Sequence, residues 1–183
     1  KLLAYSSIAH AGYALIGILS MNHAGYSGAV FYALALLILK FTCFFVVIKA
    51  ATEGQNPTMG HLAGLHQRSP ILALALLLAL FGLAGIPPTV GFTGKLLVFT
   101  AAIQQGYFFL VLIAMINVVI SLYYYILVLK AAYLTEPETQ LPQLSTPMPV
   151  KILATAMITA IVAAGLFPAH LIRIAEAATA IFI

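Results

Sequence analysis

The sequence predicts an all-α membrane protein, built as a polytopic bundle of transmembrane helices. Of its 183 residues, 63% are hydrophobic and 7% are charged. A soluble domain carries about a quarter charged residues, so this composition indicates an integral membrane protein. The apolar runs are long and do not alternate with polar residues, which favours helices over barrel strands. We expect about five crossings, one of them discontinuous.

The composition also excludes several function classes. The basic residues are few and scattered, so we expect no nucleic-acid partner, and lipid is the expected surrounding. The single cysteine, Cys43, excludes an internal disulfide and a cysteine-based metal site, and it is expected to be a small buried hydrophobe. The chain shows neither metal-ligand spacing nor a haem, iron–sulfur, flavin or nucleotide motif. We therefore expect no cofactor, no metal and no redox chemistry in this chain.

Apolar segments define the expected organisation of the chain. A transmembrane bundle is predicted over residues 1–168, with crossings at about 2–19, 28–49, 71–104 (broken near 84–91), 107–130 and 150–167. Polar loops rich in turn-forming residues separate them at 50–69 and 134–149. Residues 169–183 are expected to form an interfacial helix, whose apolar stripe contains Leu171, Ile174, Ala178 and Ile181. Because Lys1 leads directly into an apolar run, with no signal-peptide features, we expect the chain to be the back portion of a longer protein.

The segment 82–99 contains the feature that most needs a functional explanation. Helix-breaking residues interrupt it, namely Gly85, Pro87, Pro88 and Gly91, and Lys95 follows. Residues 71–105 could form a two-crossing hairpin or one discontinuous crossing. A single crossing places Lys1, Lys49, Arg68, Lys130 and Lys151 on one side and Arg173 on the other, whereas the hairpin divides the same charges four against two. The positive-inside rule therefore favours one broken crossing, a cytoplasmic side with five basic residues and a non-cytoplasmic C-terminus.

Two lysines are predicted at membrane depth. Lys95 is the only charged residue between Arg68 and Lys130, and Lys40 lies within the second apolar segment. A charged side chain at that depth costs about 2.5–3.5 kcal/mol on insertion scales, so such residues usually mark ion or proton pathways. The alternatives are snorkelling to an interface for Lys95 and an ion pair with a helix outside this chain for Lys40. The four carboxylates (Glu53, Glu136, Glu138 and Glu176) fall in loops or the tail, so an acidic partner is expected outside the chain.

Further polar residues could hydrate or extend a proton pathway. Ser6, His10 and Tyr13 share one helical face, and Ser7 lies beside them. Histidine titrates near neutral pH and suits a proton relay, although a hydrogen bond to a neighbouring helix explains His10 equally well. Asn117 and Tyr124 are the corresponding candidates on the fourth crossing.

Three segments resemble a known family. KLLAYSSIAHAGY, SPILALALLLALFGLAGIPPTVGFTGKLLVF and NVVISLYYYILVLKAAY are similar to the antiporter-like subunit N (subunit 2) of NADH–quinone oxidoreductase, respiratory complex I. The GIPPT-x-GF-x-GK run is the most specific of these motifs, and Lys95 followed by Leu96 and Leu97 favours subunit N over its sister subunits. Lys40 lies in ILKFTCFF, which resembles a segment of the sister subunits.

The resemblance implies a fold, a function and a set of partners. The chain would hold the last five crossings of a fourteen-helix subunit with two inverted repeats, that is, an antiporter-like half. Lys95 would match the lysine of the second discontinuous helix, and Lys40 would be a second proton-transfer residue. The subunit would translocate protons in the bacterial plasma membrane while NADH, FMN, iron–sulfur clusters and quinone act in partner subunits. Its partners would be other membrane-arm subunits and the absent N-terminal part. The alternatives are a subunit of a Mrp-type cation/proton antiporter or membrane-bound hydrogenase, and a structural membrane subunit.

Overall fold

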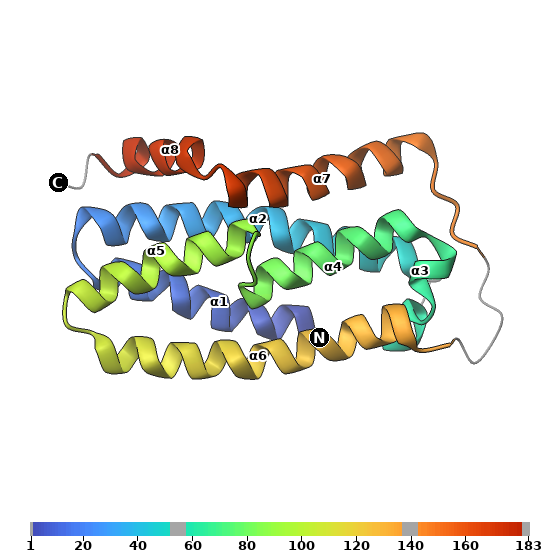
Figure 1. The fold of residues 1–183 in the computed structure, drawn as a ribbon, viewed down its shortest axis with the longest axis horizontal. Coiled ribbons are helices and arrows are strands. Elements are labelled where there is room, and N and C mark those ends of the chain that lie inside the picture. Colours follow the sequence, from blue (N-terminus) through green and yellow to red (C-terminus); the bar gives the residue numbers. More distant parts are fainter. Residues whose placement is uncertain (1, 52–57, 137–142, 181–183) are drawn as a thin grey trace.

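The computed structural model describes residues 2–51, 58–136 and 143–180, and in these ranges the regular structure is helical (Figure 1). The elements are α1 (Leu2–Leu19), α2 (His23–Ala50), a 3₁₀ turn η1 (Met59–Leu62), α3 (Leu65–Arg68), α4 (Pro70–Ala84), α5 (Val90–Gln104), α6 (Phe108–Leu134), α7 (Met148–Leu166) and α8 (Ala169–Thr179). The helices α1, α2, α6 and α7 are each long and apolar enough to cross a membrane, whereas α4 and α5 have 15 residues each. The all-helical class is thus confirmed.

The two short apolar helices follow one another along the long axis of the bundle (Figure 1). α4 ends at Gly85, which adopts the left-handed conformation with φ 86° and closes the helix through its N–H. Pro87 and Pro88 then lack the N–H groups that a continuing helix needs, and α5 begins at Val90. α4 and α5 therefore follow one another as two half-helices, the arrangement expected of one discontinuous segment, and its single crossing of the membrane stays a prediction.

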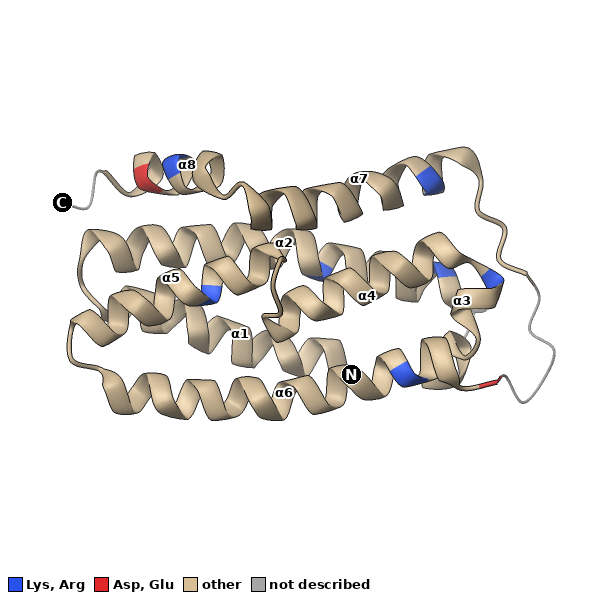
Figure 2. Cartoon of the chain, viewed as in Figure 1, with Lys and Arg blue, Asp and Glu red and all other residues tan. Residues whose placement is uncertain are grey.

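Charged residues gather near the two ends of the bundle, and two blue segments lie inside it, on α2 and α5 (Figure 2). Lys49 is in the last turn of α2, Lys130 is near the end of α6 and Lys151 is near the start of α7, all at the end that carries α3. Arg173 lies on α8 at the opposite end. This distribution is the one used to predict a single crossing, although Lys1 lies outside the described residues.

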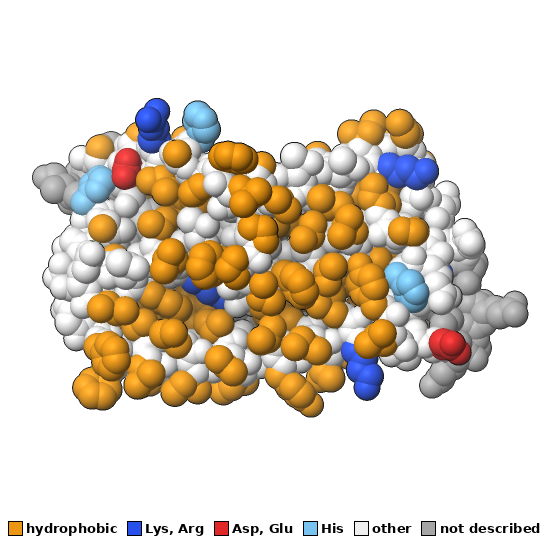
Figure 3. All heavy atoms as spheres, viewed as in Figure 1, with side chains coloured by type: hydrophobic (Ala, Val, Ile, Leu, Met, Phe, Trp, Pro, Cys, Tyr) orange, Lys and Arg blue, Asp and Glu red, His pale blue; other side chains and the backbone are white. Residues whose placement is uncertain are grey.

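The centre of the bundle is α2, which packs against α1, α4, α5 and α8. One apolar core joins α2 with α4, α6 and α7, and a smaller one joins α1, α2, α5 and α6 through Tyr13, Tyr32 and Val98. The outward faces are also apolar (Figure 3), with Ile8 70% and Phe109 78% exposed. A surface this apolar fits a lipid or protein surrounding rather than water.

Two local expectations need correction. α2 begins at His23 rather than near residue 28, because the Asn22 side chain caps its first turn by accepting a 2.7 Å hydrogen bond from the Gly25 N–H. The 50–69 segment is not wholly a water-exposed loop. It contains η1 and α3, and it buries Leu62 and Leu65 against the core because these side chains are apolar.

The last helix packs on the bundle through small side chains. Ala175 and Thr179 are buried, whereas Ile174 is 56% exposed. Ala178 is also exposed, and Ile181 of the predicted stripe lies outside the described residues. α8 therefore has one face on the bundle and leaves part of its apolar stripe free. Its location at the membrane interface stays a prediction.

Candidate proton-transfer site

The helix break exposes main-chain carbonyl groups inside the bundle. The last carbonyls of α4 have no partner within the helix, because the chain turns away at Gly85. α7 covers the break from one side, where the Thr93 hydroxyl donates a 3.4 Å hydrogen bond to the Gly165 carbonyl. These free carbonyls form an electronegative site in an apolar interior.

Lys95 occupies this site. Its Nζ atom donates hydrogen bonds to the carbonyl oxygens of Leu83 at 2.7 Å and Ala84 at 3.0 Å, and the residue is only 5% exposed. The Tyr13 ring lies on another side, with its centroid 5.4 Å from Nζ. Lys95 therefore does not snorkel. Its ammonium is held by the negative end of α4 and by an aromatic face.

His10 lies between two buried tyrosines. Its Nδ1 atom is 2.6 Å from the Tyr32 hydroxyl and its Nε2 atom is 2.9 Å from the Tyr125 hydroxyl. A neutral imidazole donates from one ring nitrogen and accepts at the other, so one tyrosine must accept and the other must donate. Such a chain of alternating donors and acceptors can pass a proton when each group reorients.

Lys40 lies at the other end of this polar cluster. Its half-buried Nζ atom donates to the Leu3 carbonyl oxygen at 3.0 Å and to the Ser6 hydroxyl. Ser6 and His10 are four residues apart and both buried on the same face of α1. Tyr13, whose ring faces Lys95, is three residues beyond His10 on α1. α1 therefore places a titratable imidazole between the two lysines.

The Tyr13 hydroxyl is a buried polar group near Lys95. It has no hydrogen-bond partner of normal geometry among the described residues, although Asn117 of α6 lies beside it. Buried polar groups are normally satisfied by protein or water. Tyr13 and Asn117 thus add polar groups from α1 and α6 to the surroundings of Lys95.

The structure brings together some of the predicted residues and separates others. Five of the predicted residues belong to one cluster, namely Ser6, His10, Lys40, Lys95 and half-buried Asn117. Ser7 is exposed and donates to the Leu3 carbonyl at 3.1 Å, so it faces away. Tyr124 is half-buried and packs edge-on against Tyr125, with ring centroids 4.7 Å apart.

The residues predicted to break the helix lie at the break itself. Pro87 and Pro88 are exposed there, while Gly91 is buried.

Sequence reasoning missed the two tyrosines that hold His10. Tyr32 and Tyr125 are each 1% exposed. Tyr125 is the last of three consecutive tyrosines, and helical phase could have singled it out, because it is four residues from buried Ser121. Tyr32 is a polar interruption of an apolar run, which is a weak signal.

The surroundings of the lysines contain oxygen atoms but no carboxylate from the described residues. The hydrogen-bond partners found for Lys40 and Lys95 are carbonyl and hydroxyl oxygens. Glu136 and Glu176 are both exposed, and Glu53 and Glu138 lie outside the described ranges. The expectation of an acidic partner beyond this chain stays a prediction.

Comparisons with known proteins agree on the family. Residues 1–121 match the family described as NADH:quinone oxidoreductase/Mrp antiporter, TM. The chain is 65% identical to NADH-quinone oxidoreductase subunit N 2 of Syntrophobacter fumaroxidans over 178 residues, and 40% identical to subunit N 2 of Solidesulfovibrio magneticus over 178 residues. Each match covers 97% of this chain, which spans 38% of the length of each relative.

Solved structures give the same answer for the fold. A chain of respiratory complex I from Thermus thermophilus superposes with a TM-score of 0.80 at 31% identity, covering 93% of this chain and 38% of that one. A chain of the Mrp complex from Dietzia superposes with a TM-score of 0.85 at 20% identity, covering 97% and 41%, and this likeness concerns the fold alone. The chain therefore belongs to the NADH:quinone oxidoreductase/Mrp antiporter transmembrane family.

Proposed function

We propose that this chain is part of a proton-translocating membrane-arm subunit of an NADH–quinone oxidoreductase. Lys95 carries the proposal, because its buried ammonium is held by the free carbonyls of a broken transmembrane helix. A charged side chain at membrane depth lowers the stability of the protein, so its presence there indicates a functional role. The relatives that are 65% and 40% identical are both named subunit N 2 of NADH-quinone oxidoreductase.

In this function the chain moves protons and other subunits supply the energy. Lys95 accepts and releases a proton, and Lys40 is a second protonatable group. His10, with Ser6 and Asn117, relays or hydrates the path between them. Ser7 and Tyr124 lie beside this proton path rather than on it. NADH oxidation, electron transfer through FMN and iron–sulfur clusters, and quinone reduction take place in partner subunits. The remaining membrane-arm subunits and the rest of the same subunit pack around this chain in a lipid bilayer, which we assign to the bacterial plasma membrane with α8 on the non-cytoplasmic side.

The test is Lys95→Ala in the assembled complex, with protons translocated per electron measured in proteoliposomes. We expect a lower ratio, because alanine cannot carry a proton across the break. Lys130→Ala is the matched control, since Lys130 is an exposed lysine near the end of α6. A wild-type ratio in Lys95→Ala would show that Lys95 has no part in translocation.

The structural likeness to a Mrp chain favours one alternative, a subunit of a cation/proton antiporter or of a membrane-bound hydrogenase. Purification of the native complex separates the two. A flavin- and iron–sulfur-containing arm supports the oxidoreductase, whereas a set of small antiporter subunits supports the alternative. A purely structural role predicts normal turnover and pumping in both Lys40→Met and Lys95→Met.

A further inference from the structure

Gly165, near the end of α7, lies directly against the link between α4 and α5. A Cβ atom added to Gly165 would lie 2.1 Å from the carbonyl oxygen of Pro88 and 2.5 Å from the carbonyl carbon of Thr89. Both are main-chain atoms, which cannot turn aside as the end of a flexible side chain can. Glycine thus allows the backbone of α7 to approach the helix break closely, where any other residue would collide with it.

The helix that carries Gly165 also packs against both half-helices. α7 contacts α4 and α5, and Gly165 lies where these two helices meet. α7 is itself anchored, because Ala154 and Ile161 are fully buried in the core that α4 shares with α2. One helix therefore fixes the position of α5 relative to α4 across the break.

α7 contacts the face of α5 that is opposite to Lys95. The Thr93 hydroxyl donates its 3.4 Å hydrogen bond to the Gly165 carbonyl oxygen. Thr93 and Lys95 are two residues apart, which separates their side chains by ~200° around a helix of ~3.6 residues per turn. A shift of α5 at Thr93 therefore also moves Lys95 relative to the carbonyl oxygens at the end of α4.

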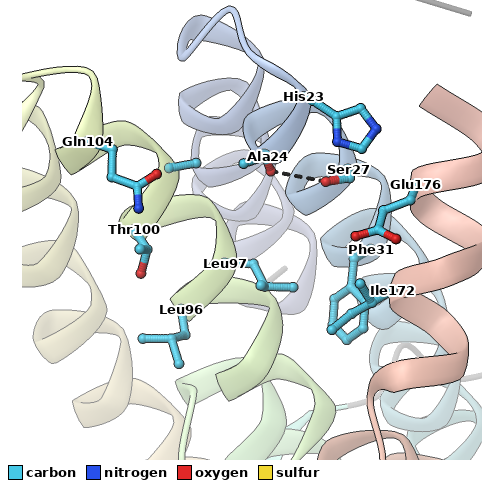
Figure 4. A pocket seen from close by; sticks show the side chains of 11 residues that line it. His23, Ala24, Ser27, Phe31, Leu96, Leu97, Thr100, Gln104, Ile172 and Glu176 are labelled. Atoms are coloured by element: carbon cyan, nitrogen blue, oxygen red, sulfur yellow. Dashed lines mark hydrogen bonds between the residues drawn. The ribbon is translucent and has the colours of Figure 1, made fainter. Parts of the chain in front are cut away.

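Beyond the break, a cleft of about 360 Å³ separates α5 from the C-terminal helix (Figure 4). α8 packs on α2, and its residues Ile172 and Glu176 line one side of the cleft. Leu97 and Thr100, in the second half of α5, line the other side. The two C-terminal helices thus hold α5 closely at Gly165 and leave space beside its second half.

We propose that Gly165 is a positioning residue for Lys95, because its missing side chain lets α7 hold the two half-helices where the Lys95 Nζ atom reaches the carbonyl oxygens of α4. The proposal rests on the proposed proton-translocating function. Ordinary contact begins at 3.4 Å, so a Cβ atom at Gly165 requires the Pro88 oxygen and α7 to separate by more than about 1 Å. A misplacement of ~1 Å far from the reacting group can lower a rate by ~100-fold.

Gly165→Ala in the assembled complex tests this role. We expect fewer protons translocated per electron, reduced towards the value of Lys95→Ala, because the hydrogen bonds of 2.7 and 3.0 Å to the lysine are stretched. Gly12→Ala is the matched control, since nothing lies within 4 Å of a Cβ atom at Gly12, and it should pump as wild type.

A cryo-electron microscopy structure of the Gly165→Ala complex gives a second readout, which a general loss of stability would not change. The distance from Lys95 Nζ to the Leu83 carbonyl oxygen should exceed ~3.5 Å, beyond the range of a hydrogen bond. A wild-type pumping ratio or an unchanged distance would each overturn the positioning role.

Two variants of Thr93 decide the question if Gly165→Ala does not assemble. Thr93→Val removes the hydroxyl that bonds to the Gly165 carbonyl, whereas Thr93→Ser keeps it. We expect reduced pumping in the valine variant and a ratio near wild type in the serine variant. Equal ratios in the two would show that the contact with α7 does not position Lys95.

The proposed function and the positioning role fail in different ways. Wild-type pumping in Gly165→Ala, in a complex whose Lys95→Ala variant is defective, overturns the role of Gly165 and leaves the proposed function intact. Normal pumping in Lys95→Ala overturns both.

Discussion

The Nζ atom of Lys95 on α5 donates a 2.7 Å hydrogen bond to the main-chain carbonyl oxygen of Leu83 on α4. The two residues belong to the two consecutive half-helices on either side of the break, so this contact closes the break with a charged group. The ammonium replaces the N–H groups that a continuous helix would have offered to the end of α4. Stability and the proposed proton transfer therefore depend on the same atom, since a lysine that loses its proton also weakens its hold on the carbonyls.

Lys95→Met should lower stability as well as transport. Methionine fills similar space but leaves the carbonyls of Leu83 and Ala84 buried without a donor, which costs about 1–3 kcal/mol for an unsatisfied group. The midpoint of thermal denaturation of the purified complex should fall, measured by light scattering or loss of quinone reductase activity. Lys130→Met serves as the comparison, and an unchanged midpoint for both variants would contradict a structural role for the Lys95 ammonium.

Gly85→Ala should disturb the lysine through its side chain. Gly85 has φ +86°, and a Cβ atom there would lie 3.0 Å from Lys95 Cδ and 3.2 Å from Nζ. Gly106 has φ +85° with nothing within 4 Å of its Cβ position, which makes it a matched control. The left-handed conformation costs an alanine about 1–2 kcal/mol in either place. We expect similar losses of stability but reduced proton pumping only in Gly85→Ala. Equal pumping in both variants would mean that Lys95 tolerates displacement.

Gly91→Ala should separate the two half-helices. Its Cβ would lie 2.0 Å from the Gly82 carbonyl oxygen, a backbone atom that cannot turn aside, so overpacking should cost at least about 1–3 kcal/mol. Gly12→Ala, with nothing within 4 Å, should be neutral or stabilising by up to ~1 kcal/mol because alanine favours the helix. Thermal denaturation and the yield of assembled complex measure both effects. The prediction fails if Gly91→Ala assembles and melts like Gly12→Ala.

Tyr125→Phe should interrupt the histidine chain while keeping the ring. It removes the hydroxyl that lies 2.9 Å from His10 Nε2 and leaves that nitrogen without its partner. We expect fewer protons translocated per electron and a stability loss of about 1–3 kcal/mol. Tyr123→Phe is the control, because Tyr123 is 69% exposed, and it should behave as wild type. Normal pumping in Tyr125→Phe would exclude this hydroxyl from the path.

The long helices could be predicted because each is a local property of the chain. The first was expected at 2–19 and α1 spans Leu2–Leu19, since a long apolar run in lipid must satisfy its own backbone as a helix. The break was equally local, because Pro87 and Pro88 cannot donate hydrogen bonds. The start of α2 was misplaced because it depends on one side-chain cap, Asn22, inside a segment of ambiguous polarity.

The candidate site was only partly predictable. Lys95, Lys40 and His10 stand out because a polar group in an apolar run is energetically costly, and such a group can be recognised in the sequence. The hydrogen-bond partners of these groups cannot be recognised in this way. Tyr32 and Tyr125 lie 22 and 115 residues from His10 along the chain and meet it only because α2 and α6 pack against α1.

The sequence by itself determined an all-helical bundle with one interrupted apolar segment and two lysines within apolar helices, because hydropathy and proline chemistry act over a few residues. The tertiary structure alone decided what these lysines meet. It turned the free carbonyls of α4 towards Lys95 and placed His10 between two tyrosine hydroxyls. These contacts join segments far apart in the chain, and helix packing, rather than local propensity, sets their geometry.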